Sequence, residues 1–547
     1  WGKAITAFRA AWDAEPKELS RAQAFADSLS SATYLLANAQ LWNDLERALK
    51  AEGINHDPLS AAASRLLRNS QQVIPLVEEA LAAGFTLNAT EVQREGKLAP
   101  LTTEFAILLL RRAPVRDVAL EVLLTAIRKA LLDLAVAGRL PEQLRPEMFD
   151  FLCALAAQCF RTEYIYPVSD EEAAQVAALQ AEIEDRLQLP DERPPRAALA
   201  VLACYRPLDE LAAKSTLEAH EVAACHDAFG ELITLQIRDA AAERAALPGI
   251  EKFAESTCET GRQLAARPAP RWTGVSRGKP AALLAWLTDL FPHADLSSQR
   301  FSATPDVLVA GCATGAEAAA AALRYRGARV LATDPEPAAL AYGLRRAAAL
   351  GIENIEWAEA GIIGLAGIER RFDMIDCTNA LNYLDEPMAG MRGLRALLKP
   401  GGVMRLSLYS ELARRAVTLP PPSGDVASSV RRLRHDIFAL LDEAPEKGVL
   451  AMDGFFVLSQ CRDLLFQGER QRFTLRALRQ SLDQLDLEFL GFELQPRGLI
   501  ERYRAKFPED LGAGDLDNWH MFETENPDFF LAKYTFWVRP RGAAAAG

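Results

Sequence analysis

Apolar residues recur at helical spacing through the first half of the chain. Within residues 4–16, Ile5, Phe8 and Trp12 fall on one face of a helix that a proline ends. Similar segments follow, separated by short polar or proline-containing stretches, and the last of them spans residues 240–258. The pattern predicts an all-α region over residues 1–260.

From residue 306 onward, short apolar runs alternate with helical segments. The strands predicted from these runs are 307–310, 329–333, 354–358, 372–377, 403–408, 488–494 and 532–538. This alternation favours a parallel sheet covered by helices on both faces. The predicted fold class is therefore α/β: a seven-stranded sheet, with five parallel strands first and the last strand antiparallel, preceded by an all-α domain.

Changes in composition mark the predicted domain boundaries. The chain has 547 residues, more than the roughly 250–300 that one hydrophobic core reaches. We predict four parts, namely an all-helical domain at 1–260, a linker and lead-in helix at 261–305, a sheet domain at 306–540 and a disordered tail at 541–547. A mainly helical insertion is predicted within the sheet domain, at 411–486.

The stretch from Asp306 to Asp334 carries the clearest chemistry. It reads DVLVAGCATGAEAAAAALRYRGARVLATD: a strand, a glycine-containing loop, a helix and a second strand that ends on Asp334. In a βαβ unit such a loop receives a ligand at the helix N-terminus, and an acidic residue about 20 positions later accepts hydrogen bonds from ribose hydroxyls. The stretch predicts a nucleoside cofactor. Asp334 could also cap the helix that follows Pro335, and the two roles are compatible.

Several segments outside that loop resemble one bacterial group of proteins. They are Gln158–Tyr164, Ala269–Trp272, Leu408–Arg415, Cys461–Phe466, Phe489–Glu493 and Tyr534–Val538. The chain resembles class I S-adenosylmethionine-dependent methyltransferases in which a helical, tetratricopeptide-like region precedes a Rossmann-like methyltransferase domain. Residues 4–16 look like the second helix of a tetratricopeptide hairpin, although no fixed ~34-residue period follows.

The resemblance implies a cofactor, a product and a set of site residues. The cofactor would be S-adenosylmethionine and the product S-adenosylhomocysteine. The positions implied to bind the cofactor are Gly311, Cys312, Ala313, Gly315, Asp334, Pro335, Ala360, Gly361, Asn379 and Ala380. Asp334 would bind the ribose, Ala360 and Gly361 would border the adenine, and Asn379 and Ala380 would flank the sulfonium.

Three residues are the candidates for the substrate side of the reaction. Tyr409 follows the fifth predicted strand, where a substrate should arrive, and its alternative role is to pack the insertion. Arg462 and Asp463 would either bind a polar substrate group or form an ion pair that holds the insertion together. No histidine, aspartate or glutamate stands at a spacing that identifies it as the general base.

The chain departs from the family pattern at several of these positions. Ala313 stands where glycine is usual, Gly361 replaces an acidic residue for which Glu359 is a substitute candidate, and Asn382 and Gln467 stand where histidines are common. Two functions therefore stay open. One is methyl transfer to a peptide or protein that the helical domain recruits, and the other is a catalytically degraded scaffold or partner of an active enzyme. An NAD-linked enzyme is disfavoured because the loop lacks the GxGxxG spacing.

Composition narrows the partners and the compartment. A net charge of −13 and a pI near 5.2 disfavour nonspecific nucleic-acid binding. No apolar run approaches the ~20 residues of a membrane span. The eight cysteines include no CxxC pair, which favours reduced thiols in a cytoplasm and predicts no metal site. A homodimer or a hetero-complex is compatible with this composition.

Three further segments have two interpretations each. The basic cluster Arg431–His435 is predicted to be a solvated helix face rather than a binding patch. The aromatic segment Phe160–Pro167 would end a helix and pack on the next, or would project Glu163 and Tyr164 toward the site. Asp517–His520 would form either a lid over the site or a turn packed on the sheet edge.

Overall fold

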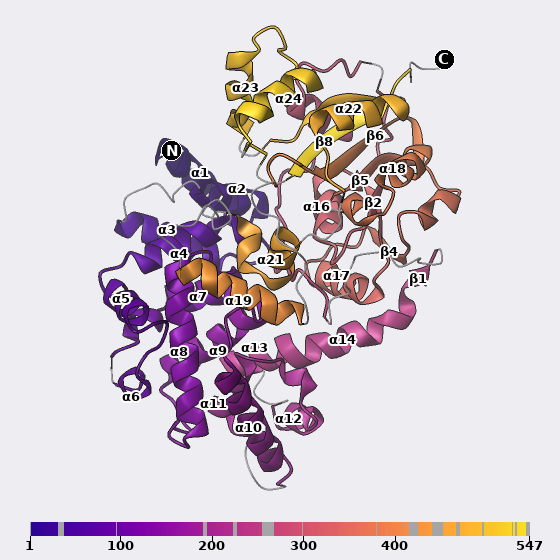
Figure 1. Ribbon diagram of the computed structural model, residues 1–547. Coiled ribbons are helices and arrows are strands. Elements are labelled where there is room, and N and C mark those ends of the chain that lie inside the picture. Colours follow the sequence, from indigo (N-terminus) through magenta and orange to yellow (C-terminus); the bar gives the residue numbers. More distant parts are fainter. Residues whose placement is uncertain are drawn as a thin grey trace. The chain divides into compact units, whose positions relative to one another are not determined.

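The chain folds into two compact units (Figure 1). The computed structural model describes all residues except 1, 31–37, 95, 190–193, 222–226, 254–266, 298, 379, 415–424, 440–451, 467–470, 495–496, 528, 531–532 and 543–547. The helical unit comprises residues 1–244, 271–276 and 422–464, and the sheet unit comprises residues 245–270, 277–421 and 465–547.

This division differs from the predicted one in two places. The first boundary follows residue 244 instead of residue 260, and most of the predicted insertion at 411–486 belongs to the helical unit. The reason is packing: in the described part of 422–464, Arg434 bonds to Glu121 and Ser459 bonds to Glu163, and both carboxylates belong to the first 244 residues. The predicted tail at 541–547 lies mostly outside the described residues.

The helical unit is built around one long helix, α8 (Val118–Val136). Fourteen of its 19 residues are buried, because α4, α5, α6, α10 and α11 pack on it. The helices of this unit are α1 (Gly2–Ala14), α2 (Leu19–Ser30), α3 (Ala39–Lys50), α4 (Ser60–Arg68), α5 (Ile74–Ala82), α6 (Ala89–Val92), α7 (Glu104–Arg112), α8, α9 (Pro146–Arg161), α10 (Asp170–Leu187), α11 (Arg196–Ala203), α12 (Lys214–Glu221), α13 (Ala228–Ile233), α14 (Asp239–Ala246), α19 (Val426–Ala439) and α21 (Leu458–Leu465).

A buried ion pair joins α19 to α8. Both terminal nitrogens of Arg434 donate to the two carboxylate oxygens of Glu121, each at 2.8 Å. The two side chains are 0% and 1% exposed. The prediction of a solvated basic face is therefore wrong for Arg434, since α19 turns this residue into the helical unit and leaves Arg432 and His435 exposed.

The segment after α9 forms hydrogen bonds with residues of the inserted segment 422–464. Glu163 has a positive φ of 59°, and its carboxylate accepts hydrogen bonds from the backbone N–H and the hydroxyl of Ser459, both at 2.8 Å. The carbonyl of Tyr164 accepts a hydrogen bond from Arg431 at 2.8 Å. Glu163 therefore places its carboxylate at the N-terminal turn of α21, where the helix N–H groups favour a negative charge. Neither interpretation of the segment included this role.

The sheet unit contains eight strands in the order β1-β4-β3-β2-β5-β6-β8-β7. They are β1 (Glu251–Lys252), β2 (Asp306–Ala310), β3 (Arg329–Asp334), β4 (Ile355–Glu359), β5 (Phe372–Cys377), β6 (Leu398–Tyr409), β7 (Leu487–Phe492) and β8 (Lys533–Pro540). β8 runs antiparallel to both of its neighbours, as predicted for the last strand. The predicted count of seven is wrong because β1, placed in a helix by the sequence pattern, pairs with β4 at the sheet edge.

Helices cover the two faces of this sheet. They are α15 (Leu283–Leu290), α16 (Ala316–Arg324), α17 (Pro337–Ala349), α18 (Pro387–Ala396), α22 (Leu475–Gln484), α23 (Ile500–Lys506) and α24 (Leu516–Glu525). One face packs with α18, α22 and α24 into an apolar core that includes Leu308, Ile375, Met404 and Phe536. α16 packs over β2 and β3, and α17 over β3 and β4.

The segment Asp517–His520 belongs to α24 and is neither a lid nor a turn. Trp519 is 1% exposed, and its ring stacks on Tyr503 with 3.8 Å between the ring centroids. Its indole N–H donates to the carbonyl of Ala513 at 2.8 Å. This tryptophan is a core residue of the sheet unit.

None of the described helices combines the length and the apolar composition that crossing a membrane requires. The described residues also contain no group of three or more histidine, cysteine, aspartate or glutamate side chains placed to hold a metal ion.

We expect Arg434→Met to destabilise the helical unit by about 3–5 kcal/mol, because it leaves the Glu121 carboxylate buried without its cation. Replacing Glu121 with Leu in the same chain should recover most of that loss, since no buried charge then remains. Arg432→Met, on the exposed face of the same helix, is the matched control. Thermal unfolding followed by circular dichroism measures all three, and an equal effect of Arg434→Met and Arg432→Met would contradict the assignment.

Candidate functional site

The strand order reverses direction at β2, which lies between β3 and β5. In α/β sheets a ligand crevice opens at the carboxyl ends of the strands at such a switch point. Here the loops that follow β2 and β5 approach each other closely, since a Cβ on Gly311 would lie only 2.3 Å from the Cβ of Ala380. The absence of a side chain at Gly311 is therefore required by packing.

The loop after β2 alternates through left-handed backbone conformations. Gly311, Ala313 and Gly315 have φ values of 68°, 49° and 84°. Gly315 is the N-cap of α16, and a Cβ there would lie 2.4 Å from the ring of Trp357. Ala313 adopts the same conformation with a Cβ, which costs free energy that glycine would not. The sequence-based concern about this alanine thus has a structural basis.

Asp334, the last residue of β3, organises this loop. One carboxylate oxygen accepts the backbone N–H of Ala313 at 2.7 Å, and the other accepts the N–H of Glu336 at 3.0 Å. Glu336 is the N-cap of α17. Asp334 therefore orders both the glycine-containing loop after β2 and the start of the next helix. Its predicted role in ribose binding stays a prediction.

These residues fit a nucleoside cofactor in kind and position. A carboxylate has about four acceptor sites, so Asp334 can accept ribose hydroxyls in addition to its backbone partners. However, Asp334 is 0% exposed. A ribose hydroxyl can reach the carboxylate only if the atoms that cover it move aside.

The loop after β4 reaches the same edge of the sheet. The N–H of Ala360 donates to the carbonyl of Asp334 at 3.2 Å, and the carbonyl of Gly361 accepts the N–H of Leu365 at 3.2 Å. Both Ala360 and Gly361 are buried. The side chain of Glu359, the substitute candidate, lies 3.8 Å from the ammonium of Lys252.

The loop after β5 is tied to the end of β6 by one amide side chain. The oxygen of Asn382 accepts the backbone N–H of Tyr409 at 2.9 Å, and its nitrogen donates to the carbonyl of Ser407 at 3.5 Å. Asn382 is buried. The residue that replaces a usual histidine therefore positions Tyr409 through its backbone. Asn379 and Gln467 lie outside the described residues.

Tyr409 ends β6 at the same carboxyl edge as the cofactor loop. Its ring is buried, and the guanidinium carbon of Arg414 lies 3.6 Å from the ring centroid. Across the ladder, Tyr409 pairs with Lys533 of β8. Arg462 and Asp463 belong to the helical unit, where they form an ion pair at 3.0 Å. A substrate role for these three residues stays a prediction.

A buried carboxylate lies directly behind the end of β6. Glu523 of α24 accepts hydrogen bonds from Ser410 at 2.6 Å and from the Tyr534 hydroxyl at 2.8 Å. Burial raises the pKa of Glu523, and these two donors only partly offset that effect. No local sequence pattern indicates this cluster, because its three members are more than ten residues apart along the chain.

A charged cluster lies under α16, on the face of the sheet opposite the apolar core formed with α18, α22 and α24. Arg405, in the middle of β6, pairs with Asp376 at 2.9 Å, with Glu317 at 3.0 Å and with Glu493 at 2.7 Å. Burial would raise the pKa of Glu493, but the Arg405 guanidinium and the Trp537 indole lower it overall. The cluster fixes the first turn of α16, which follows the glycine loop. An arginine within the apolar run VMRLSLY was the one sequence signal for it.

Part of the sheet unit matches a known family. Residues 308–404, from β2 to the middle of β6, match the family model of a methyltransferase domain. The match agrees with the predicted methyltransferase domain and supports S-adenosylmethionine as the cofactor. An uncharacterized protein of Synechococcus sp. is 29% identical over 114 residues, which are 21% of this chain and 27% of that relative. This chain therefore matches only about a quarter of the length of that relative.

Two solved structures illustrate the wider similarity. PKMT2 from Rickettsia typhi aligns over 47% of this chain and 52% of its own, with 14% identity and a TM-score of 0.34. A S-adenosylmethionine-dependent methyltransferase from Clostridium acetobutylicum aligns over 43% of this chain and 84% of its own, with 14% identity and a TM-score of 0.25. Alignments this loose carry no argument about the substrate or the mechanism of this chain.

We expect Ala313→Gly to stabilise the sheet unit by about 0.5–1 kcal/mol, because glycine adopts the left-handed conformation without a Cβ penalty while its extra freedom in the unfolded chain offsets part of the gain. The same substitution at Ala320, inside α16, should instead destabilise by about 1 kcal/mol. Urea denaturation measures both changes. If both substitutions destabilise the protein, alanine is more favourable than glycine at position 313, and the proposed strain is refuted.

We expect the stability of the sheet unit to depend on pH through Glu523. Its folded pKa is raised above the unfolded value near 4.3, so the folded state binds the proton more tightly, and the free energy of unfolding falls as pH rises through the folded pKa. Glu523→Gln cannot ionise, so its melting temperature relative to the parent should rise as pH increases from the unfolded value near 4.3 through the raised folded pKa. Glu509→Gln, in an exposed turn, should show a constant difference, and a constant difference for Glu523→Gln would refute the assignment.

Proposed function

We propose that this protein transfers a methyl group from S-adenosylmethionine to a peptide or protein substrate recruited with its helical unit. The observation that carries the proposal is the β2–α16–β3 unit at the switch point, with Asp334 hydrogen-bonded to the loop, inside the segment that matches a methyltransferase domain. This arrangement supports a nucleoside cofactor at the carboxyl ends of β2 and β3.

The residues that would hold the cofactor come from four loops at one edge of the sheet. Asp334 would accept the ribose hydroxyls, the backbone of residues 311–315 would run beside the methionine part, Ala360 and Gly361 would border the adenine, and Ala380 would lie near the sulfonium. Bound there, the cofactor supplies an electrophilic methyl group. The protein then has to position the acceptor atom in line with it.

Tyr409 is the substrate-side residue that we propose at this edge. Asn382 fixes its backbone, and Arg414 covers its ring, so its position is set from two directions. Ser410 and Glu523 support the same strand end from behind. A strand end held this firmly suits the precise in-line geometry that methyl transfer requires.

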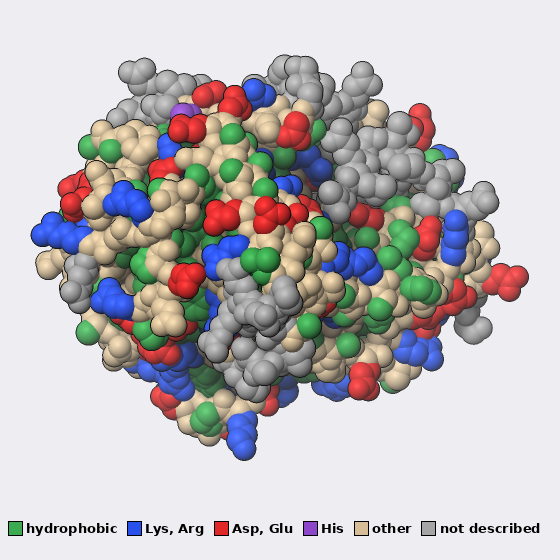
Figure 2. Space-filling model, turned by 90° about the horizontal axis from the view of Figure 1, so that it is seen from below, with side chains coloured by type: hydrophobic (Ala, Val, Ile, Leu, Met, Phe, Trp, Pro, Cys, Tyr) green, Lys and Arg blue, Asp and Glu red, His purple; other side chains and the backbone are tan. Residues whose placement is uncertain are grey.

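The helical unit supports the proposed class of substrate. It is a separate compact body of helices. We propose that it is of the tetratricopeptide-like kind, because stacked helical repeats present extended concave binding surfaces. Acidic and basic side chains are interspersed over the coloured residues of the face in Figure 2. A peptide or protein therefore suits this chain better than nucleic acid, which favours a continuous basic face. A homodimer or hetero-complex is part of the same proposal.

A second candidate function is a scaffold that has kept the fold and lost the chemistry. Two observations favour it: Ala313 holds a left-handed conformation, and the Asp334 carboxylate is covered and already engaged by backbone N–H groups. Covering of the carboxylate opposes the approach of a ribose, and the left-handed alanine lowers the stability of the loop that would receive the cofactor. The enzyme requires affinity for S-adenosylmethionine, whereas the scaffold does not.

Calorimetric titration with S-adenosylmethionine and S-adenosylhomocysteine separates them. We expect micromolar binding to the full chain, abolished in Asp334→Ala because the ribose contacts and the order of the loop are lost together. Asp306→Asn is the matched control. This aspartate lies at the amino end of β2, away from the carboxyl ends of the strands, and pairs with Arg329 and Lys399. That variant should bind as the parent does. Folded protein that binds neither compound would overturn the enzyme and favour the scaffold.

A further inference from the structure

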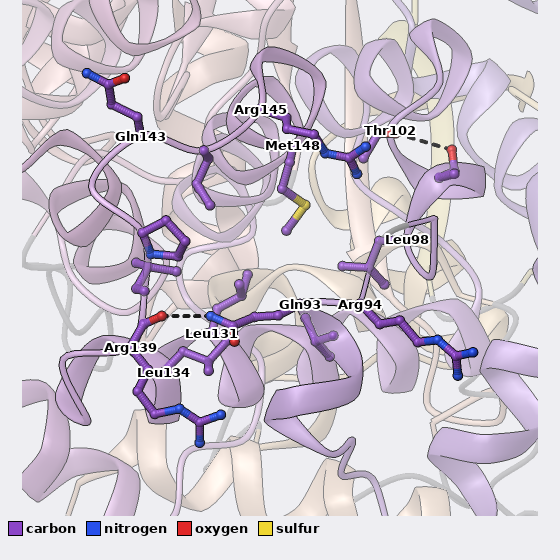
Figure 3. Close-up of a pocket in the computed structure, with 15 residues that line it drawn as sticks. Gln93, Arg94, Leu98, Thr102, Leu131, Leu134, Arg139, Gln143, Arg145 and Met148 are labelled. Atoms are coloured by element: carbon purple, nitrogen blue, oxygen red, sulfur yellow. Dashed lines mark hydrogen bonds between the residues drawn. The ribbon is translucent and has the colours of Figure 1, made fainter.

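The helical unit contains a cavity of about 440 Å3 that the methyltransferase function does not use. It lies between α6, the turn before α7, the second half of α8 and the segment that leads into α9 (Figure 3). All of its lining residues belong to the helical unit. Its volume falls within the roughly 300–1,000 Å3 of small-molecule sites.

The floor of this cavity is apolar and well packed. Leu98, Leu131 and Leu134 are between 1% and 4% exposed, and Met148 and Leu98 point into the open space in Figure 3. The cavity exists because α6 has only four residues, which is too short to cover the length of α8. An apolar body placed there would gain the burial that α6 does not provide.

The rim is basic. Arg94, Arg139 and Arg145 come from three different positions along the chain and are exposed. No aspartate or glutamate is among the described residues that line the cavity. Two glutamates outside the described lining, Glu91 and Glu147, lie beside two of these arginines, so the positive charge belongs to the lining and not to the whole surroundings.

Arg94 and Arg145 each form a solvent-exposed ion pair, and Arg139 has a neutral hydrogen-bond partner. Arg94 lies 3.5 Å from Glu91, and Arg145 lies 3.5 Å from Glu147, with all four side chains at least 45% exposed. Exposed pairs of this kind are weak and exchange readily with another anion. Arg139 donates to the hydroxyl of Thr90 at 3.2 Å, which is a neutral partner. Arg145 is also the N-cap of α9, without a side-chain cap bond, so the positive end of this helix adds to the field.

We propose that this cavity binds a small amphipathic anion: a molecule with an acyl or aryl body for the leucine-lined floor and a carboxylate or phosphate group for the arginine rim. Charge complementarity selects an anion, because the charged side chains among the described lining residues are three guanidiniums, which repel a cationic head group. The enclosed floor selects a compact body rather than an extended chain. This ligand is distinct from the methyl donor and from the methyl acceptor.

The proposal is tested with the full chain and three ten-carbon probes: decanoate, decyl phosphate and decyltrimethylammonium, each below its micelle concentration. Calorimetry should give one saturable site for an anionic probe, at least about tenfold tighter than any binding of the cation. The ratio of the decanoate and decyl phosphate affinities identifies the preferred head group. Affinity should also fall as salt increases, because the rim is exposed to solvent.

Variants test the position of the site. Arg139→Gln with Arg145→Gln should weaken the anion by roughly tenfold, and Met148→Trp should abolish binding by filling the cavity. Arg65→Gln, an exposed arginine of α4 outside the lining, should have no effect. Circular dichroism checks that each variant is folded, and Arg139→Gln alone keeps the test valid if the N-cap change at Arg145 disturbs α9.

Three results would overturn the proposal. These are equal affinity for the anionic and cationic probes, affinity that is unchanged in both the arginine and the Met148→Trp variants, and saturable binding of an acidic leucine-containing peptide with none of decanoate or decyl phosphate. The last result would assign the cavity to a protein partner instead of a small molecule.

Discussion

The carboxylate of Asp334 accepts hydrogen bonds from two segments that leave the sheet at different strands. The N–H of Ala313 belongs to the loop after β2, and the N–H of Glu336 begins α17 after β3. Both hydrogen bonds are partly buried, so this acceptor replaces water that reaches the two N–H groups only in part. The shape of the cofactor edge, the direction of α16 and the start of α17 all depend on this one side chain. The charged cluster around Arg405 then fixes α16 from below.

Features that depend on neighbours in the chain could be predicted from the sequence. Strand β5 was predicted with the bounds that the structure has, from a short run of six residues of which four are apolar. The glycine loop and Asp334 form a local βαβ pattern and were predicted as a unit. Strand β1 could not be predicted, since two residues at a sheet edge have no pattern of their own and pair only because β4 lies beside them.

Features that depend on distant partners were missed or misread. Arg434 looked like a solvent-facing residue because its partner, Glu121, precedes it by 313 positions. Asn382 was noted only as a missing histidine, whereas its hydrogen bonds to residues 407 and 409 give it a structural role. Glu523 carried no signal, since a buried carboxylate is recognised by its donors, and Ser410 lies 113 positions away. In each case the tertiary fold decides what the charge or amide does.

The inserted helix α19 has a consequence for how this chain can be divided. The polypeptide passes between the two units five times, after residues 244, 270, 276, 421 and 464. A fragment that ends near residue 260 would contain Glu121 without Arg434, and one that begins there would contain Arg434 without Glu121. Neither half is therefore a complete folding unit. Recombination at a single point near residue 260 would separate Arg434 from Glu121. The two units are therefore inherited together rather than exchanged one at a time.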